Sequence, residues 1–151
     1  LSKSYSMTGV GVGYMAASTE IVSTLSKSQS HISGNVCTVA QYGAMAALSL
    51  DDDMLITRQT EMQQKRNIAF RYASKLFSCI QPQGAFYLFP DVLQHLKNGM
   101  TAVDLAAHLL ENFGVAVVPG EAFGMPGHIR ISYAVSEENL ESGFDKIAEA
   151  L

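Results

Sequence analysis

The sequence of 151 residues has no clustered positive charge and no long apolar run, and these shortages exclude several classes of function. Its ten lysines and arginines are scattered and its formal net charge is -4, so it lacks the basic face that binds nucleic acid. No apolar stretch approaches the roughly 18 residues that span a bilayer, and the N-terminal residues lack the basic-then-apolar order of a secretory signal. We therefore expect no nucleic-acid partner and no association with a membrane.

Cysteine is also scarce: Cys37 and Cys79 stand alone, without a CxxC pair or a nearby pair of histidines. This spacing favours two buried thiols in a reducing compartment, the cytoplasm, over a disulfide framework or a zinc site. The four histidines do not fall at metal-ligand spacing, so we expect no bound metal. No Ser-His-Asp or Cys-His constellation can be argued from residue order either.

What the chain does have is hydrophobic sequence, 48% of its residues, which is enough for a core of its own at this length. In the first half, the glycine-containing apolar stretch at residues 10–17 predicts a buried strand, and residues 21–25 predict a short helix. The polar stretch at 26–35 predicts a loop. Small residues dominate positions 38–50, and they predict a helix that packs closely against its neighbour.

A long helix is predicted next, from about residue 54 to residue 77. Its apolar residues form one thin stripe and most of the others are polar, so only a narrow edge of the helix can be buried. A helix of this kind often bridges two packed bodies. We therefore place a domain boundary inside it, which divides the chain into residues 1–60 and 61–151.

The second half alternates short strands with amphipathic helices. Strands are predicted in the aromatic run 85–89, at 115–118 and at 128–134, on both sides of a turn-rich loop. Helices are predicted at 101–114, where Thr101 and Asp104 have the spacing of a capping box, and from Ser136 to the C-terminal end. This order predicts an α/β sandwich of two layers.

Lys3 is the first candidate for chemistry, because it lies among the hydroxyl side chains of Ser2, Ser4, Ser6 and Thr8. One interpretation is a solvated surface lysine. The other is a Schiff-base lysine, whose neutral amine requires burial or nearby positive charge, and the apolar strand predicted downstream would supply the burial. The hydroxyls would suit an anionic group beside that lysine.

Three alternating glycines, Gly9, Gly11 and Gly13, follow the lysine and suggest the phosphate-binding loop of a dinucleotide fold. That loop requires the order strand, glycines, helix. Here the glycines lie within the apolar stretch and the helix comes much later. Glycines that permit close packing are the better interpretation, at Gly13 at least.

Arg130 is the second candidate. The strand period of two places it on the face opposite Ile129, Ile131 and Tyr133. One interpretation is a solvated arginine on the outer side of a sheet. The other is a guanidinium fork that grips a carboxylate through two parallel hydrogen bonds, and the preceding glycine-rich loop would leave it accessible.

Several segments of this chain, in their order, resemble the class I pyridoxal-phosphate aminotransferases, the aspartate aminotransferase group. Residues 2–14 read SKSYSMTGVGVGY and resemble the lysine motif of that family. The other matching segments are 29–41, 82–90 and 119–134. Together they extend over essentially all 151 residues, and they resemble the C-terminal portion of the family's longer chain.

The resemblance implies an α/β fold of fold type I. Residues 1–60 would form the end of the large cofactor-binding domain, and 61–151 the small C-terminal domain. The implied cofactor is pyridoxal 5'-phosphate. Lys3 would be the catalytic lysine that forms the Schiff base and transfers the proton, Ser2 would help hold the cofactor phosphate, and Arg130 would bind the substrate α-carboxylate.

The function that the resemblance implies is transamination between an aspartate-like amino acid and a 2-oxo acid. The implied assembly is a homodimer, in which residues 30–35 approach the active site of the partner subunit. One departure is Gly11, which replaces the family's phosphate-binding arginine; another is that the upstream part of the family's chain is absent. We therefore expect no transamination by this chain alone, and the alternative is a non-catalytic homologue or fragment that serves dimerisation or partner binding.

Overall fold

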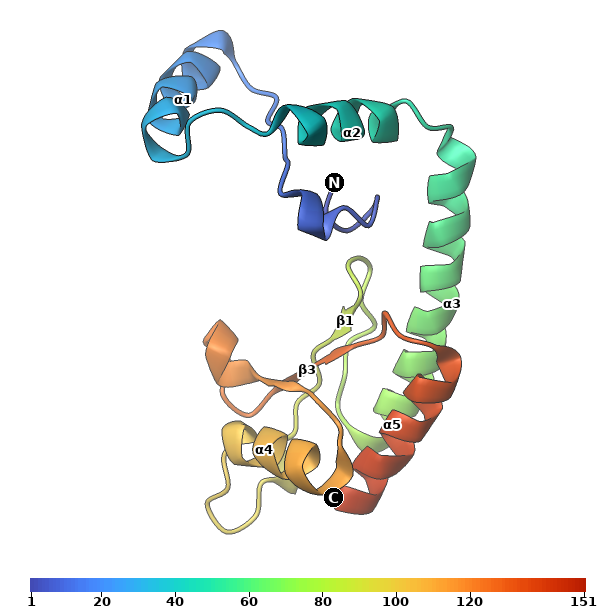
Figure 1. Cartoon of the computed structure of the whole chain (residues 1–151). Coiled ribbons are helices and arrows are strands. Elements are labelled where there is room, and N and C mark those ends of the chain that lie inside the picture. Colours follow the sequence, from blue (N-terminus) through green and yellow to red (C-terminus); the bar gives the residue numbers. More distant parts are fainter. The chain divides into compact units, whose positions relative to one another are not determined.

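The computed structural model describes residues 1–151, which form two compact units. Unit 1 is Leu1–Arg58 and unit 2 is Gln59–Leu151. Helix α3 (Asp52–Leu76) contributes its first turns to unit 1 and the rest to unit 2 (Figure 1). None of the helices is long and apolar enough to cross a membrane.

Unit 1 is helical and contains no strand. Its elements before α3 are the 3-10 helix η1 (Thr8–Val10) and the helices α1 (Thr19–Ile32) and α2 (Thr38–Leu48). No side chain of α1 is buried. In α2, buried alanines recur at helical spacing and mark one close-packing edge: Ala40, Ala44 and Ala47.

The structure corrects two predictions in this unit. The buried strand predicted at 10–17 is wrong, because residues 11–18 have no regular structure, and no strand in residues 1–58 is available to pair with them. The loop predicted at 26–35 is also wrong, since α1 continues to Ile32. The hydroxyls of Thr24 and Ser30 donate to carbonyls within the helix, so these polar residues are accommodated in helical conformation. The helices predicted at 38–50 and 54–77 are confirmed as α2 and α3.

Unit 2 contains a three-stranded antiparallel sheet in the order β1-β3-β2. The strands are β1 (Tyr87–Leu88), β2 (Val118–Pro119) and β3 (Ile129–Ser132). The outer strands are shorter than predicted. Before β1, Ala85 has φ of 59°, which is outside the extended region, and Pro90 after it has no N–H to continue the ladder. Pro119 likewise cannot donate to β3.

Two capped helices complete unit 2, and both confirm the predictions. Helix α4 (Ala102–Phe113) begins with a capping box, in which the Thr101 hydroxyl accepts from the Asp104 N–H at 3.2 Å. The Asp104 carboxylate accepts in return from the Thr101 N–H at 2.8 Å. Helix α5 (Glu137–Ala150) is capped by Ser136, whose hydroxyl accepts from the Asn139 N–H.

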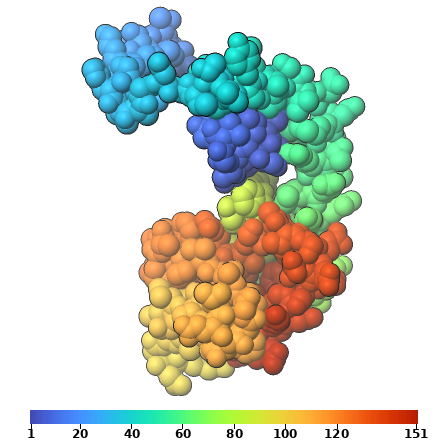
Figure 2. Space-filling view, in the orientation of Figure 1, coloured from blue at the N-terminus to red at the C-terminus, as the bar shows by residue number.

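The core of unit 2 lies between the sheet and these helices. On β3 and just beyond it, Ile129, Ile131 and Tyr133 are buried, and they pack with residues of α3, α4 and α5. These partners are Ala69, Ala73, Leu105, Leu109, Leu140, Phe144 and Ile147. Figure 1 shows α4 and α5 beside the paired strands, and Figure 2 shows residues 100–151 as one continuous packed body. The predicted two-layer α/β architecture is confirmed, and the strand alternation places Arg130 on the side away from this core.

Candidate functional site

Lys3 lies in a tight turn at the beginning of unit 1. The Tyr5 N–H donates to the Leu1 carbonyl at 3.1 Å, and the Ser6 N–H donates to the Lys3 carbonyl at 3.2 Å. Ser6 closes the turn in the left-handed region, with φ of 56°. Lys3 itself is exposed, so the burial expected from a downstream strand is absent in this chain.

Side-chain hydrogen bonds hold the peptide before Lys3 and the peptide after Ser4. The Thr8 hydroxyl donates to the Ser2 carbonyl at 3.0 Å. From α3, Arg58 Nη1 donates to the Ser4 carbonyl at 3.2 Å and to the Ser6 hydroxyl oxygen at 3.1 Å. The Lys3 amine and the Ser2 hydroxyl have no polar partner within the chain. The turn therefore fixes its backbone and leaves an amine and a hydroxyl free for a ligand.

Gly11 follows η1 with φ of 63° and ψ of 38°, a left-handed conformation that glycine adopts without strain. An arginine, which the resemblance leads us to expect at this position, would be strained in this conformation. A Cβ at Gly9, Gly11 or Gly13 would meet no atom within 4 Å. The close-packing interpretation of Gly13 is therefore wrong. A dinucleotide-binding loop needs a strand, then the glycines, then a helix, and the structure has no strand before these glycines.

Arg130 lies on β3, where its guanidinium contacts aromatic rings. Its Cζ is 4.3 Å from the ring centroid of Tyr87 and 4.7 Å from that of Phe123. The side chain is half-buried, and it makes no hydrogen bond or ion pair within the chain. Ring contacts thus hold the cation while its N–H donors stay available, an arrangement that can receive a carboxylate.

Strand register and a tight loop place these two rings. Tyr87 pairs with Ser132, and so stands diagonally across from Arg130 on the same face of the sheet. Phe123 ends η3 (Gly120–Phe123), in a loop that closes where the Gly120 N–H donates to the His128 carbonyl at 2.7 Å. A Cβ on Gly120 would collide with the Met125 carbonyl oxygen, so only glycine fits this closure.

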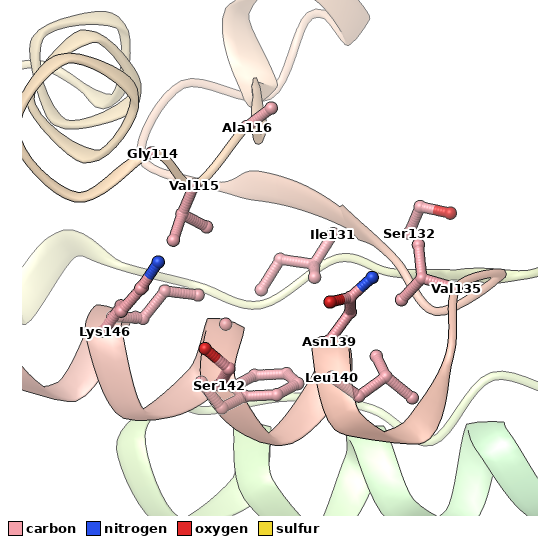
Figure 3. A pocket seen from close by; sticks show the side chains of 13 residues that line it. Gly114, Val115, Ala116, Ile131, Ser132, Val135, Asn139, Leu140, Ser142 and Lys146 are labelled. Atoms are coloured by element: carbon pink, nitrogen blue, oxygen red, sulfur yellow. The ribbon is translucent and has the colours of Figure 1, made fainter.

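A separate pocket of about 400 Å³ lies between β3, the residues after α4, and α5 (Figure 3). Its floor is apolar, with Ile131 and Leu140 among the lining residues. In Figure 3 the Lys146 side chain extends from α5 toward Val115. Arg130 does not line this pocket, so it is distinct from the predicted carboxylate site.

The thiols differ from the prediction of two buried cysteines. Cys37 is exposed, because it precedes the first turn of α2 in a unit with little buried surface. Cys79 is half-buried, and burial raises the pKa of its thiol. Burial also raises the pKa of the Tyr133 phenol, which donates to the Ala85 carbonyl at 3.0 Å beside β1.

The structure divides the predicted site residues between the two units. Ser2 and Lys3 lie in unit 1, and Arg130 lies in unit 2. Sequence reasoning missed Tyr87 and Phe123, which contact Arg130, and Arg58, which contacts the turn that carries Lys3. For Tyr87 the signal was present, since its diagonal position follows once the two strands are paired. No sequence pattern joins Arg58 to the lysine turn.

A family model, aminotransferase class I and II, matches residues 1–147 of this sequence. The chain belongs to this family. As an aminotransferase chain it is 42% identical over 154 residues to a probable aspartate/prephenate aminotransferase of Aquifex aeolicus, covering 99% of the chain and 39% of the relative. It is 37% identical over 151 residues to an aspartate aminotransferase of Geobacillus stearothermophilus, with 97% of the chain and 38% of the relative covered.

Solved structures give the same result. The aspartate aminotransferase of Thermotoga maritima matches this aminotransferase chain with a TM-score of 0.86 and 39% identity, over 98% of the chain and 37% of that structure. A double mutant of the Thermus thermophilus aspartate aminotransferase matches with a TM-score of 0.89 and 30% identity, over 99% of the chain and 39% of that structure. The chain thus spans about two fifths of its relatives' length, and the fold-type I prediction is confirmed.

Proposed function

We propose that the protein containing this chain catalyses pyridoxal-phosphate-dependent transfer of an amino group between an aspartate-like amino acid and a 2-oxo acid. The observation that carries the proposal is the unpaired guanidinium of Arg130, held 4.3 Å from the Tyr87 ring centroid. An exposed turn with a free amine supports it. Both lie in a chain of the aminotransferase family. In this proposal, residues 1–60 are the end of the large cofactor-binding domain and 61–151 are the small domain.

The residues of the lysine turn fit the cofactor. A phosphorylated aldehyde requires an amine for the aldehyde and hydrogen-bond donors for the phosphate. The free amine of Lys3 and the free hydroxyl of Ser2 supply one of each. When bound, pyridoxal phosphate supplies an electron sink that stabilises negative charge on the substrate α-carbon. Lys3 would then hold the cofactor through its amine and move the α-proton, and Ser2 would hold the phosphate.

Arg130 would bind and orient the substrate through its α-carboxylate. A planar guanidinium offers two parallel N–H donors to a carboxylate, and lysine cannot reproduce this geometry. The contacts with Tyr87 and Phe123 restrict the side chain before substrate arrives, which lowers the entropy lost on binding. A substrate held in this way presents its α-carbon in one orientation.

With Gly11 in place of an arginine, the cofactor phosphate would be bound less tightly. A hydrogen bond to a charged group contributes roughly 1.5–3 kcal/mol, so the lack of an arginine here would reduce cofactor affinity about ten- to a hundredfold. The left-handed backbone at Gly11 opposes a simple reversal, because an arginine side chain is strained at φ of 63°. Other donors would have to hold the phosphate.

The proposed setting is a cytoplasmic homodimer in which residues 30–35 approach the partner's active site. The experiment uses the longest natural chain that contains these residues, assayed for amino transfer from aspartate to 2-oxo acids. Lys3→Ala should abolish transfer. Arg130→Lys should raise KM for the amino acid about tenfold or more, through loss of one charged hydrogen bond. Transfer that survives in Lys3→Ala, or a KM unchanged in Arg130→Lys, would contradict the proposal.

Gly11 also favours a second candidate, a homologue that keeps the fold for dimerisation or partner binding without catalysis. Cofactor titration of the wild type and of Gly11→Arg separates the two. Tighter binding in the variant, despite its strained backbone, supports a weakened enzyme. Absence of cofactor binding in both proteins supports the non-catalytic candidate.

A further inference from the structure

Arg58 reaches the lysine turn from far along the sequence. It lies on the first turns of α3, and its Nη1 donates to the Ser4 carbonyl at 3.2 Å and to the Ser6 hydroxyl oxygen at 3.1 Å. These partners are 54 and 52 residues away. All three residues belong to unit 1.

The contact completes a set of hydrogen bonds around Lys3. The Ser2 carbonyl accepts from the Thr8 hydroxyl, and the Lys3 carbonyl accepts from the Ser6 N–H. The Ser4 carbonyl accepts from Arg58. The first two bonds hold the peptide planes before and after Lys3, which determine the direction of its Cα–Cβ bond, and Arg58 holds the next peptide plane along the turn. The amine at the end of that side chain stays unpaired.

Packing contributes little to this turn, because no residue from 1 to 14 is buried and only a few, such as Tyr5 and Met7, are half-buried. Ser6 also adopts a left-handed conformation, φ of 56°, which a serine in an isolated chain rarely populates. Polar contacts are therefore an important part of what stabilises the turn. Two of these contacts come from Arg58, and they join the turn to a long helix.

We propose that Arg58 is a positioning residue for Lys3. By bonding to Ser4 and Ser6, it fixes the turn to α3 so that the Lys3 amine is presented to the aldehyde of the cofactor. This inference rests on the proposed function, since it assigns the purpose of the turn to cofactor attachment. It adds a residue that acts on the lysine through the backbone and does not contact the reacting atoms.

The first test needs no cofactor. Trypsin cleaves after Lys3, and the cleavage rate at Lys3–Ser4 in the cofactor-free chain reports how often the turn opens. Arg58→Gln should accelerate this cleavage about two- to fivefold, as expected for loss of an exposed charged hydrogen bond. Arg58→Lys keeps a cation that can reach one acceptor, so its cleavage rate should lie between those of the wild type and Arg58→Gln. Arg71→Gln, an exposed arginine on the same helix, should leave the rate unchanged.

The second test asks whether the turn presents the amine. Each variant is incubated with pyridoxal phosphate and reduced with borohydride, and the modified lysines are located by mass spectrometry. Arg58→Gln should lower labelling of Lys3 about two- to fivefold while leaving Lys27, on exposed α1, unchanged. Arg58→Lys should restore part of the labelling. Equal loss at both lysines would indicate misfolding of the chain and would contradict a positioning role.

The two tests separate this inference from the proposed function. Equal cleavage at Lys3–Ser4 in the wild type and in Arg58→Gln would overturn the inference, whatever the activity. Faster cleavage with unchanged Lys3 labelling would also overturn it, because the turn would then be held without consequence for the amine. If wild-type Lys3 takes no label, the proposed function fails, and the trypsin result still decides whether Arg58 holds the turn.

Discussion

Arg130 and Tyr87 come from adjacent strands, and the guanidinium carbon of one lies 4.3 Å from the ring centroid of the other. Tyr87→Leu removes this contact, whose contribution is about 0.5–2 kcal/mol, and should raise KM for the amino acid about two- to thirtyfold with little change in kcat. Steady-state kinetics on the longest natural chain measure the effect. Tyr42→Leu, at an exposed tyrosine without a ring contact, is the matched control.

The loop that carries Phe123 depends on Gly120. Gly120→Ala places a Cβ against the Met125 carbonyl oxygen and should lower the free energy of unfolding by about 1–3 kcal/mol. Gly143→Ala is the matched control, because a Cβ there meets open space within α5, and it should stabilise the protein by about 0.5–1 kcal/mol. Urea unfolding measures both. Equal effects of the two substitutions would contradict the loop closure described above.

The capping box of α4 predicts a pH dependence of stability. Hydrogen bonds from the Thr101 hydroxyl and N–H hold the pKa of Asp104 below its usual value of 3.8. The cap therefore stabilises the folded state fully above that pH, and this stability is lost as the pH falls through the lower, folded-state pKa.

Asp104→Asn should consequently be less stable than the wild type at neutral pH, with the difference shrinking in acid. Thermal unfolding followed from pH 7 to about pH 3 measures the convergence. Glu111→Gln, on the same helix but outside the cap, is the control for the loss of a carboxylate. A constant difference between the wild type and Asp104→Asn at all pH values would show that the carboxylate does not act through its ionisation.

The two thiols should react at different rates. Cys37 is exposed, whereas Cys79 is half-buried and its pKa is raised by burial, so less thiolate is available at Cys79. In the folded protein at pH 8, a disulfide reagent should label Cys37 first and Cys79 slowly. In denaturant, both cysteines should react at the same rate. The variant Cys37→Ser assigns the fast phase. If the fast phase persists in that variant, the assignment is wrong.

Much of unit 2 could be predicted from the sequence because local chemistry determines it. Residues such as Thr101 and Ser136 cap a helix when they directly precede an amphipathic segment. The alternation in β3 places Arg130 opposite the buried isoleucines. Where β1 and β2 end depends on the left-handed backbone of Ala85 and on prolines that cannot donate to a neighbouring strand. Such features appear only once the strands are paired.

Unit 1 was predicted less well because little of it is buried. Composition favoured a strand at 10–17, yet a strand requires a partner, and residues 1–58 contain none. The role of Arg58 was invisible for a different reason, since its contacts join positions more than fifty residues apart. The resemblance to aminotransferases placed Lys3 and Arg130 as site candidates, and their roles stay predictions.

The central claim is that Lys3 holds the cofactor. The most direct measurement is borohydride reduction of the longest natural chain after saturation with pyridoxal phosphate, followed by mass-spectrometric mapping of the modified residue. We predict one modified lysine per chain, at Lys3. Modification spread over exposed lysines such as Lys27 and Lys75, with Lys3 no more labelled than they are, would contradict the account.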